Sequence, residues 1–376
     1  MRIGLVCRHY LATKGGLEKY TLNLSRELVR RGHEVHVFCN TGTPTAGVHL
    51  HHVPIFPFSS PGKNFSFARM AGAAITASGL DITQSMERIW TQDIFRASDG
   101  INPIQMQEKY PNRCWRAFKA AGPRRQVLTL LERRIFQKGG ARWIMTNSML
   151  VRNQIIRYYG VADDKIAVIY NSVDTERFNV STKSVFRQRI RDRFGIAPAE
   201  RLILFMGNDF QRKGLALLLE AVAGLEDTGI RVLVAGSDAP GRYRRLAMQI
   251  GIGDRVLFIG HHKQVEELYG AADLFVLPTR YDAFANVCLE AMACGTPVIT
   301  TRSNGAAEII EGAAQGYVLE TWEAQELAAR IREAFRDGGL ETMGAAAARK
   351  AATFTMDRYM RSIMALYNKV CEAKSA

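Results

Sequence analysis

Two segments in the second half of the chain contain residue types that bind phosphates and sugars. In the first, GNDFQRKGL at residues 207–215, Gly207 follows an apolar run, and Arg212 and Lys213 precede a pattern typical of a helix. A helix that begins after a buried strand attracts anions at its N-terminus, and a guanidinium beside an ammonium suits a diphosphate. The segment is not a Walker A loop. It predicts phosphate binding, with a solvated basic turn as the alternative.

The second segment is RYDAFANVCLEAMACGTPVI, residues 280–299. Asp282 lies in a loop after an apolar run, and Glu290 follows it within a helical pattern. The small residues Ala283 and Ala285 let the backbone approach a ligand closely, and the free N–H groups at a helix start can bind phosphate oxygens. Glu290 stands among apolar residues and needs a partner, for which a ribose diol is suitable. A helix with one exposed acid is the alternative.

The first half of the chain contains weaker candidates. Gly15 and Gly16 precede a helical pattern and could contact a sugar or a phosphate, although tight turns commonly use such pairs. Asp99, in TQDIFRASDG, is a candidate acid on the acceptor side, with a turn residue as the alternative. The histidine pairs at 51–52 and 261–262 lack the spacing of metal ligands, and the chain has no Asp-x-Asp motif. We therefore expect no metal site.

Apolar runs and helical patterns alternate along most of the chain. In the first part we expect strands at Ile3–Cys7, Glu34–Cys39, Asp81–Gln84, Trp143–Thr146 and Ile166–Ile169, with helices at Leu17–Arg30 and Ser148–Tyr159. Residues 40–80 show no clear pattern, and residues 85–140 are expected to be irregular and strongly basic. The polar segment NSVDTERF, residues 171–178, suits a linker between domains.

The alternation is cleaner after this segment. Strands are expected at Leu202–Met206, Arg231–Ala235, Val256–Ile259, Leu274–Leu277, Val298–Thr300 and Tyr317–Leu319, and helices at Leu215–Leu225, Arg242–Ile250, Val265–Ala271, Asn286–Ala293 and Ala324–Phe335. Short apolar strands alternating with helices favour a doubly wound parallel sheet. The sequence therefore predicts an α/β protein of two Rossmann-like domains, residues 1–170 and 171–354, that face a central cleft. Ligands of such sheets bind beyond the carboxyl ends of the strands.

Composition sets outer limits on function. The chain has 376 residues, 47% of them hydrophobic and 23% charged, which is typical of a soluble protein of two domains. Its six cysteines are scattered, its first residues do not form a signal peptide, and no apolar run is long enough to span a bilayer. We therefore expect a cytoplasmic protein. The formal charge of +14 predicts an anionic partner.

Half of that charge lies in residues 105–140, which contain nine Lys or Arg and two acids. Aromatic and aliphatic residues are interleaved with the basic ones, among them Trp115, Phe118 and Phe136. This mixture suits a segment that lies on an anionic membrane surface. The alternative is a solvated basic helix pair that packs its aromatic residues into the first domain.

Taken together, the motifs resemble glycosyltransferase family 4, whose fold is called GT-B. The resemblance covers nearly the whole chain and is carried by GGLEKY, NSVDTERF, GNDFQRKG, AADLFVLPT, DAFANVCLE, CGTPVI and GAAEII, in that order. Within the family, GNDFQRKG, the position of Asp99 and the basic segment after it resemble enzymes that add glucose to the heptose of the lipopolysaccharide core.

The resemblance implies a retaining transfer of a hexose, with UDP-glucose as the indicated donor and a lipopolysaccharide-core or similar glycan as acceptor, and with no metal or other cofactor. It assigns Arg212 and Lys213 to the departing diphosphate, Glu290 to the ribose and Asp282 to the hydroxyls of the donor sugar. Asp99 corresponds to an acid close to the transferred sugar. The other donor contacts that it implies are Gly15, Gly16, Gly207, Ala283, Phe284, Ala285 and Asn286.

The resemblance also implies that the last helix, near Thr355–Cys371, crosses back to the first domain, so that residues 355–376 pack there. One position departs from the family pattern, because Asp282 stands where the family has Glu. The shorter side chain leaves galactose, N-acetylhexosamine and mannose open as donor sugars.

Two other functions compete with glycosyl transfer: a nucleotide-sugar epimerase or phosphorylase of the same fold, and a nucleic-acid-binding protein suggested by the pI of 9.7. No RRM, KH or helix-turn-helix signature supports the latter, so no nucleic-acid partner is expected.

Overall fold

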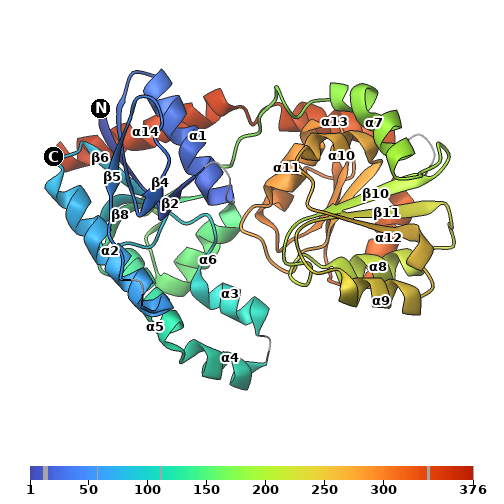
Figure 1. Ribbon diagram of the computed structural model, residues 1–376, viewed down its shortest axis with the longest axis horizontal. Coiled ribbons are helices and arrows are strands. Elements are labelled where there is room, and N and C mark those ends of the chain that lie inside the picture. The colour runs from blue at the N-terminus through green and yellow to red at the C-terminus, as the bar shows by residue number, and fades with distance from the viewer. Residues whose placement is uncertain (12–15, 57, 111, 337–338, 376) are drawn as a thin grey trace. The chain divides into compact units, whose positions relative to one another are not determined.

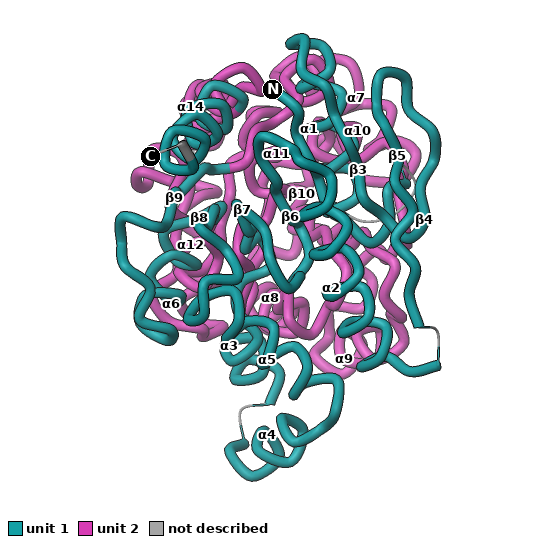
Figure 2. Tube along the Cα trace, turned by 90° about the vertical axis from the view of Figure 1, so that its left-hand side faces the viewer, with its two compact units in different colours: residues 1–170, 360–376 teal, residues 171–359 magenta. Residues whose placement is uncertain are grey.

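Strands and helices alternate along the chain and form two units, residues 1–170 with 360–376 and residues 171–359 (Figure 2). The computed structural model describes all residues except 12–15, 57, 111, 337–338 and 376. Each unit is a parallel sheet with helices packed against it. None of the helices in the described part of the chain combines the length and apolarity needed to cross a bilayer.

Unit 1 contains a seven-stranded sheet in the order β5-β3-β1-β6-β7-β8-β9, in which all neighbouring strands are parallel. Its strands are β1 (Arg2–Val6), β3 (Glu34–Cys39), β5 (Val48–His52), β6 (Ile82–Ser85), β7 (Gln92–Arg96), β8 (Ala141–Thr146) and β9 (Ile166–Val168), beside a small pair β2 (His9–Tyr10) and β4 (Thr41–Gly42). Its helices are α1 (Gly16–Arg30), α2 (Ser60–Ala77), α3 (Asn102–Lys109), α4 (Arg113–Ala120), α5 (Pro123–Gln137) and α6 (Met149–Tyr159), with a short 3₁₀ turn at Asp163–Lys165.

Several of these elements have no clear pattern in the sequence. The expectation of irregular structure at residues 85–140 is wrong, because β7 and the helices α3 to α5 lie there. Likewise β5 and α2 lie within residues 40–80. Polar and apolar residues do not alternate in β7, because all five of its side chains are buried. The buried carboxylate of Asp93 accepts hydrogen bonds from the backbone N–H and the hydroxyl of Thr83, both at 2.9 Å.

The C-terminal helix α14 (Met356–Ser375) returns to unit 1. The hydroxyl of Tyr367 donates to Gln84 Oε1 at 2.7 Å, and Lys374 Nζ donates to the carbonyl of Asp81 at 2.7 Å. In Figure 1 this helix and α1 lie on one side of the strands of unit 1, and α2 and α5 lie on the other. Both faces of the sheet are therefore covered, as buried parallel strands require.

Unit 2 contains a six-stranded parallel sheet in the order β12-β11-β10-β13-β14-β15. The strands are β10 (Arg201–Met206), β11 (Ile230–Ala235), β12 (Val256–Gly260), β13 (Leu274–Leu277), β14 (Val298–Thr301) and β15 (Gly316–Leu319). The helices are α7 (Ser181–Arg193), α8 (Leu215–Ala223), α9 (Gly241–Gln249), α10 (Val265–Ala271), α11 (Asn286–Ala293), α12 (Ala324–Ala334) and α13 (Gly339–Ala351), with 3₁₀ turns at Gly253–Arg255 and Gly305–Ile309. Figure 1 shows α7, α10, α11 and α13 on one face of this sheet, and α8, α9 and α12 on the other.

The strand order of unit 2 reverses between β10 and β13. From β10 the chain runs outward to β11 and β12, and it then returns to place β13 on the other side of β10, with Ile203 opposite Leu274. The carboxyl ends of the two strands consequently share one edge, and their loops leave in opposite directions. Such a reversal is the usual ligand position of an open parallel sheet.

Segment 171–178 is part of unit 2 and is bonded to it. The N–H of Val173 donates to the carbonyl of Phe354 at 2.9 Å, and Asp174 Oδ1 caps the next turn by accepting from the N–H groups of Glu176 and Arg177 at 3.2 Å. Arg177 in turn forms an ion pair with Glu266 at 2.6 Å. The expected linker is therefore an ordered entry to the second unit.

Candidate functional site

The loop after β10 begins with Gly207 and ends where α8 starts. Its tight conformation depends on Gly214, which has a φ of +81° and would bring a Cβ within 2.0 Å of the carbonyl oxygen of Pro278. Only glycine fits there, because the backbones of the β10–α8 and β13–α11 loops nearly touch. Asp209 has a φ of +62° and accepts from Arg212 Nε at 3.2 Å. These constraints fix the two basic residues relative to the neighbouring loop.

Asp282, in the loop after β13, forms ion pairs with both Arg212 and Lys213. The ammonium of Lys213 pairs with Asp282 Oδ2, and Arg212 Nη1 contacts the same oxygen at 3.2 Å. Arg212 Nη1 also donates to the carbonyl of Tyr281 at 2.7 Å. Burial raises the pKa of Asp282, but the charges of Lys213 and Arg212 outweigh burial and hold it below its usual value. The structure thus brings together three of the residues that the sequence predicted for donor binding.

Asn304 shapes the loop that carries Asp282. This fully buried amide accepts from the N–H groups of Ala285 and Ala306 at 3.1 Å through Oδ1, and it donates to Thr300 Oγ1 at 2.9 Å. The N–H of Asp282 donates to the carbonyl of Ser303 at 2.9 Å. Sequence reasoning missed Asn304, although a polar residue directly before the GAAEII motif was the available signal.

The predicted residues 283–286 form the end of this loop. Ala283, Phe284 and Ala285 are buried, so what they can offer a ligand is their backbone. Asn286 is exposed at the start of α11, and its Oδ1 accepts from Asn171 Nδ2 at 2.7 Å. A buried loop that ends at an exposed helix N-terminus can present N–H groups to a phosphate.

Glu290, within α11, is half-buried and accepts a hydrogen bond from the hydroxyl of Tyr269 at 2.9 Å. Tyr269 is fully buried, and burial together with the negative charge of Glu290 raises the pKa of its hydroxyl well above the usual value. The tyrosine therefore stays a protonated donor at neutral pH. A carboxylate has about four acceptor sites, more than the bond to Tyr269 uses. Sequence analysis had assigned no role to Tyr269.

The remaining candidates belong to unit 1. Asp99 follows β7 with an exposed side chain, and its carbonyl accepts from Gln105 Nε2 at 2.7 Å. The adjacent carbonyl of Gly100 accepts from Arg88 Nη2 at 3.2 Å, and the buried carboxylate of Glu132 accepts from Arg88 Nε at 2.8 Å. Gly16 is the first residue of α1 and is exposed. Gly15 lies outside the described residues.

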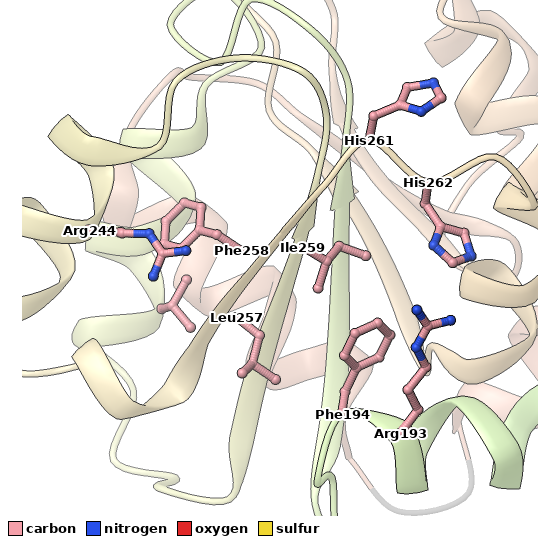
Figure 3. A pocket seen from close by; sticks show the side chains of 9 residues that line it. Arg193, Phe194, Arg244, Leu257, Phe258, Ile259, His261 and His262 are labelled. Atoms are coloured by element: carbon pink, nitrogen blue, oxygen red, sulfur yellow. The ribbon is translucent and has the colours of Figure 1, made fainter.

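A pocket of about 430 Å³ lies beside the edge strand β12 and includes none of the predicted site residues. Figure 3 shows Arg193 and Phe194 at the end of α7 below His262, and Arg244 of α9 next to Phe258. Its cations and aromatic rings form a second, separate feature of unit 2. Within the described residues, no group of three or more His, Cys, Asp or Glu side chains could hold a metal ion.

The basic segment 105–140 comprises most of α3 and all of α4 and α5. Its apolar residues divide into two classes: Leu131 and Phe136 are buried in unit 1, whereas Trp115 and Phe118 are 58% and 69% exposed. Trp115 and Phe118 belong to α4, which has no buried residue, and Leu130 of α5 is also exposed. The expected alternative of a helix pair that packs its aromatic residues into the first domain describes Phe136 but not Trp115 or Phe118.

Comparison with known proteins agrees with this architecture. The profile of Glycosyltransferase Family 4 matches residues 14–91 and 110–177, and the profile of Glycosyl transferases group 1 matches residues 186–351. A probable transglycosylase of Burkholderia thailandensis is 31% identical over 383 residues, which cover 100% of this chain and 98% of that protein. The lipopolysaccharide glucosyltransferase WaaG of Escherichia coli is 26% identical over 354 residues, which cover 92% of this chain and 92% of that protein.

A D-inositol 3-phosphate glycosyltransferase of Geodermatophilus obscurus is 28% identical over 96% of this chain and 86% of its own length. Among solved structures, WaaG superposes with a TM-score of 0.79 at 24% identity over 99% of both chains. An Anabaena protein, HepE, in complex with UDP-glucose superposes with a TM-score of 0.73 at 18% identity, over 100% of this chain and 99% of that one. The fold predicted from the sequence is confirmed, and the chain belongs to the family 4 glycosyltransferases with the GT-B fold.

Proposed function

We propose that this glycosyltransferase moves a hexose, with glucose as the first candidate, from a UDP-sugar to a lipopolysaccharide-core or similar glycan acceptor, with retention and without a metal ion. The observation that carries the proposal is the meeting of Arg212, Lys213 and Asp282 where the strand order of unit 2 reverses. If a nucleotide diphosphate binds there, the positive charges of Arg212 and Lys213, which the fold already holds in place, would stabilise it as the leaving group.

The charges of this cluster suit a diphosphate better than a neutral ligand. Lys213 is 8% exposed, so its ammonium lies in a weakly screened environment where it acts strongly on nearby charge. Asp282 pairs with both cations, and the exposed carboxylate of Asp209 pairs with Arg212 at 3.2 Å, so the ammonium of Lys213 is shared with Asp282 alone among the ion pairs of this cluster. Departure of the sugar increases the negative charge on the diphosphate, and preorganised cations stabilise such a transition state.

The carboxylate of Glu290 supports the nucleoside part of the proposal. Its bond to Tyr269 orients it, and a carboxylate is a suitable acceptor for the 2′ and 3′ hydroxyls of a ribose. Asp282 can use its second oxygen, Oδ1, which accepts from the N–H of Phe284 at 3.2 Å, to contact hydroxyls of the donor sugar. Asp99 is proposed as the acid of unit 1 that acts on the acceptor side.

UDP-glucose is favoured as donor by the relatives, since WaaG is a lipopolysaccharide glucosyltransferase and HepE was crystallised with UDP-glucose. The shorter carboxylate of Asp282 keeps galactose, N-acetylhexosamine and mannose as competing sugars. A thermal-shift series with UDP-, GDP- and ADP-sugars tests the donor, because a ligand that binds only the folded state raises the unfolding midpoint. We expect UDP-glucose to raise it most. No shift with any nucleotide sugar would contradict the proposal.

Incubation with the donor alone separates transfer from the other reactions of this fold. A nucleotide-sugar epimerase converts the donor without an acceptor, whereas a transferase releases UDP at the full rate only when a glycan acceptor is added. We expect acceptor-dependent release.

We further propose that the protein acts at the cytoplasmic face of the membrane and associates with it through residues 105–140. The support is α4, whose residues Arg113, Arg116 and Lys119 stand beside the exposed rings of Trp115 and Phe118. Basic residues near an anionic surface contribute about 1 kcal/mol each. A phosphorylated lipid-linked acceptor would give the same charges a second use.

A further inference from the structure

The loop between β5 and α2 presents large apolar side chains to solvent. Phe58 is 91% exposed and Phe56 is 65% exposed. On α2, Phe65 and Met70 are 39% and 44% exposed. A single exposed apolar residue needs no explanation, but several in one segment mark a binding surface. We call Phe56 and Phe58 the phenylalanine tip.

Two hydrogen bonds hold the chain next to the tip. The N–H of Phe56 donates to Ser66 Oγ at 3.0 Å, which joins the loop to the second turn of α2. Ser59 caps the same helix by accepting from the N–H of Gly62 at 3.1 Å. Side-chain hydrogen bonds therefore hold Phe56 and the start of α2, on either side of Phe58.

The stretch of sequence that contains the tip is basic and has no acid. Between Glu34 and Asp81 the chain contains no Asp or Glu, whereas Lys63 and Arg69 lie on α2 close to the tip. Arg69 and Arg134 both approach the ring of Trp90, at 5.5 and 5.7 Å. An acid-free segment with exposed rings is complementary to an anionic, partly apolar partner.

The tip and α4 lie toward the same side of unit 1. Figures 1 and 2 both show α4 and the N-terminal end of α2 toward the lower edge of that unit. A planar partner could contact both segments at once. A bilayer surface is such a partner, since it offers anionic head groups to the basic residues and an apolar boundary to the rings.

We propose that the phenylalanine tip inserts into the head-group boundary of an anionic bilayer, as an apolar anchor separate from the basic helix α4. The inference rests on the proposed membrane association and assigns to it residues outside 105–140. The two anchors differ in their physical basis. Screening weakens the attraction of α4 as salt rises, whereas removal of apolar rings from water does not depend on screening.

Flotation with vesicles of phosphatidylethanolamine and phosphatidylglycerol tests the tip with the full chain. The variant is Phe56→Ser/Phe58→Ser, and the matched control is Met248→Ser, since Met248 is 73% exposed on α9 in unit 2. We expect the double variant to reduce vesicle partitioning at least about tenfold, since each ring removes substantial apolar area from water. The control should partition like the wild type. Both variants should unfold at nearly the wild-type temperature, because the replaced side chains lie at the surface.

Salt separates the two anchors. At about 1 M salt, where the screening length is near 3 Å, we expect residual wild-type binding that the double variant lacks. Equal flotation of the double variant and the wild type would overturn the inference while leaving the membrane proposal intact. Failure of the wild type to float at low salt would instead refute membrane association itself. A wild-type dimer in solution that the double variant loses would show that the tip binds a second copy of the chain, which would also overturn the inference.

Discussion

Lys213 and Asp282 come from loops that follow adjacent parallel strands, and their side chains meet in an ion pair beyond the carboxyl ends of β10 and β13. The pair is largely buried, with side-chain exposures of 10% and 17%. Removal of one partner from such a pair leaves an uncompensated charge in the interior, which is more costly than the pair itself. Loss of the charge of either Lys213 or Asp282 should therefore lower the free energy of unfolding.

Replacement of Lys213 or Arg212 by Ala should lower turnover far more than it lowers stability. Each cation is proposed to face the departing diphosphate, and loss of one such group costs about 10²–10³ in rate. Arg242→Ala, an exposed basic residue of α9, is the control. Steady-state kinetics and thermal unfolding of the same preparations check this. Near-normal rates in both folded variants would refute the phosphate assignment.

The pH dependence of stability should report the ion pair. The pKa of Asp282 in the folded protein is below its usual value, so its contribution to stability is present above the unfolded pKa and is lost as pH falls through the folded one. In Lys213→Ala, burial should dominate and raise the pKa of Asp282. We expect the difference in unfolding free energy between the wild type and this variant to be greatest at neutral pH and to shrink below about pH 4. Denaturant titrations across pH measure it, and a constant difference would contradict the coupling.

Glu290→Ala and Asp282→Ala should damage different steps. Glu290 is proposed to hold the ribose, and a hydrogen bond to a charged group contributes roughly 1.5–3 kcal/mol, so affinity for UDP should fall about tenfold or more. Asp282 is proposed to face the sugar, so its loss should spare UDP binding and reduce transfer. Calorimetry with UDP, alongside transfer assays, distinguishes the two variants. Equal losses of UDP affinity would show that one of the assignments is misplaced.

The sequence predicted unit 2 better than unit 1, for a physical reason. The strands of unit 2 are short buried apolar runs bounded by turns, and β10 and β13 agree with their predicted positions within one residue. In unit 1, β7 contains Gln92, Asp93 and Arg96, which are buried by specific partners that no local pattern reveals. The helix α2 is apolar on several sides, and it therefore lacks a clear helical stripe.

The candidate site shows the same division. Arg212, Lys213 and Asp282 could be found because charged residues directly after apolar strands stand out. Asn304 and Tyr269 could not, because a buried amide and a buried tyrosine act through tertiary contacts with residues 19 and 21 positions away. Local patterns thus located the groups that are proposed to meet a ligand, and only the fold located the groups that position them.

Tyr269→Phe should weaken nucleotide binding through Glu290. The variant removes the hydroxyl that donates at 2.9 Å and keeps the ring that packs against Phe178 and Phe275. We expect a several-fold loss of affinity for UDP, since a hydrogen bond to a charged group is lost. A 2′,3′-dideoxy analogue of UDP should bind the wild type and the variant equally, because it lacks the hydroxyls that Glu290 would bind. Tyr317→Phe in β15 is the control, and equal losses for both nucleotides would indicate a merely structural tyrosine.

The basic helix α4 offers the cleanest test of electrostatic membrane binding. Arg125 and Arg134 of α5 are unsuitable for substitution, because Arg125 donates to Asn102 Oδ1 at 2.6 Å and Arg134 donates to the carbonyl of Lys138 at 2.9 Å. The set Arg113→Gln, Arg116→Gln and Lys119→Gln changes only residues of α4, where no side chain is buried.

We expect the wild type to float with vesicles rich in phosphatidylglycerol at low salt, and the triple variant to bind on the order of a hundredfold more weakly, because each basic residue contributes about 1 kcal/mol near such a surface. A triple substitution of Arg242, Arg244 and Arg245 in α9 removes the same charge from unit 2 and should leave flotation nearly unchanged. If both triple variants lose binding equally, the attraction comes from the net charge of +14 and not from α4. Equal transfer rates to a soluble acceptor in the wild type and the α4 variant would then separate membrane binding from catalysis.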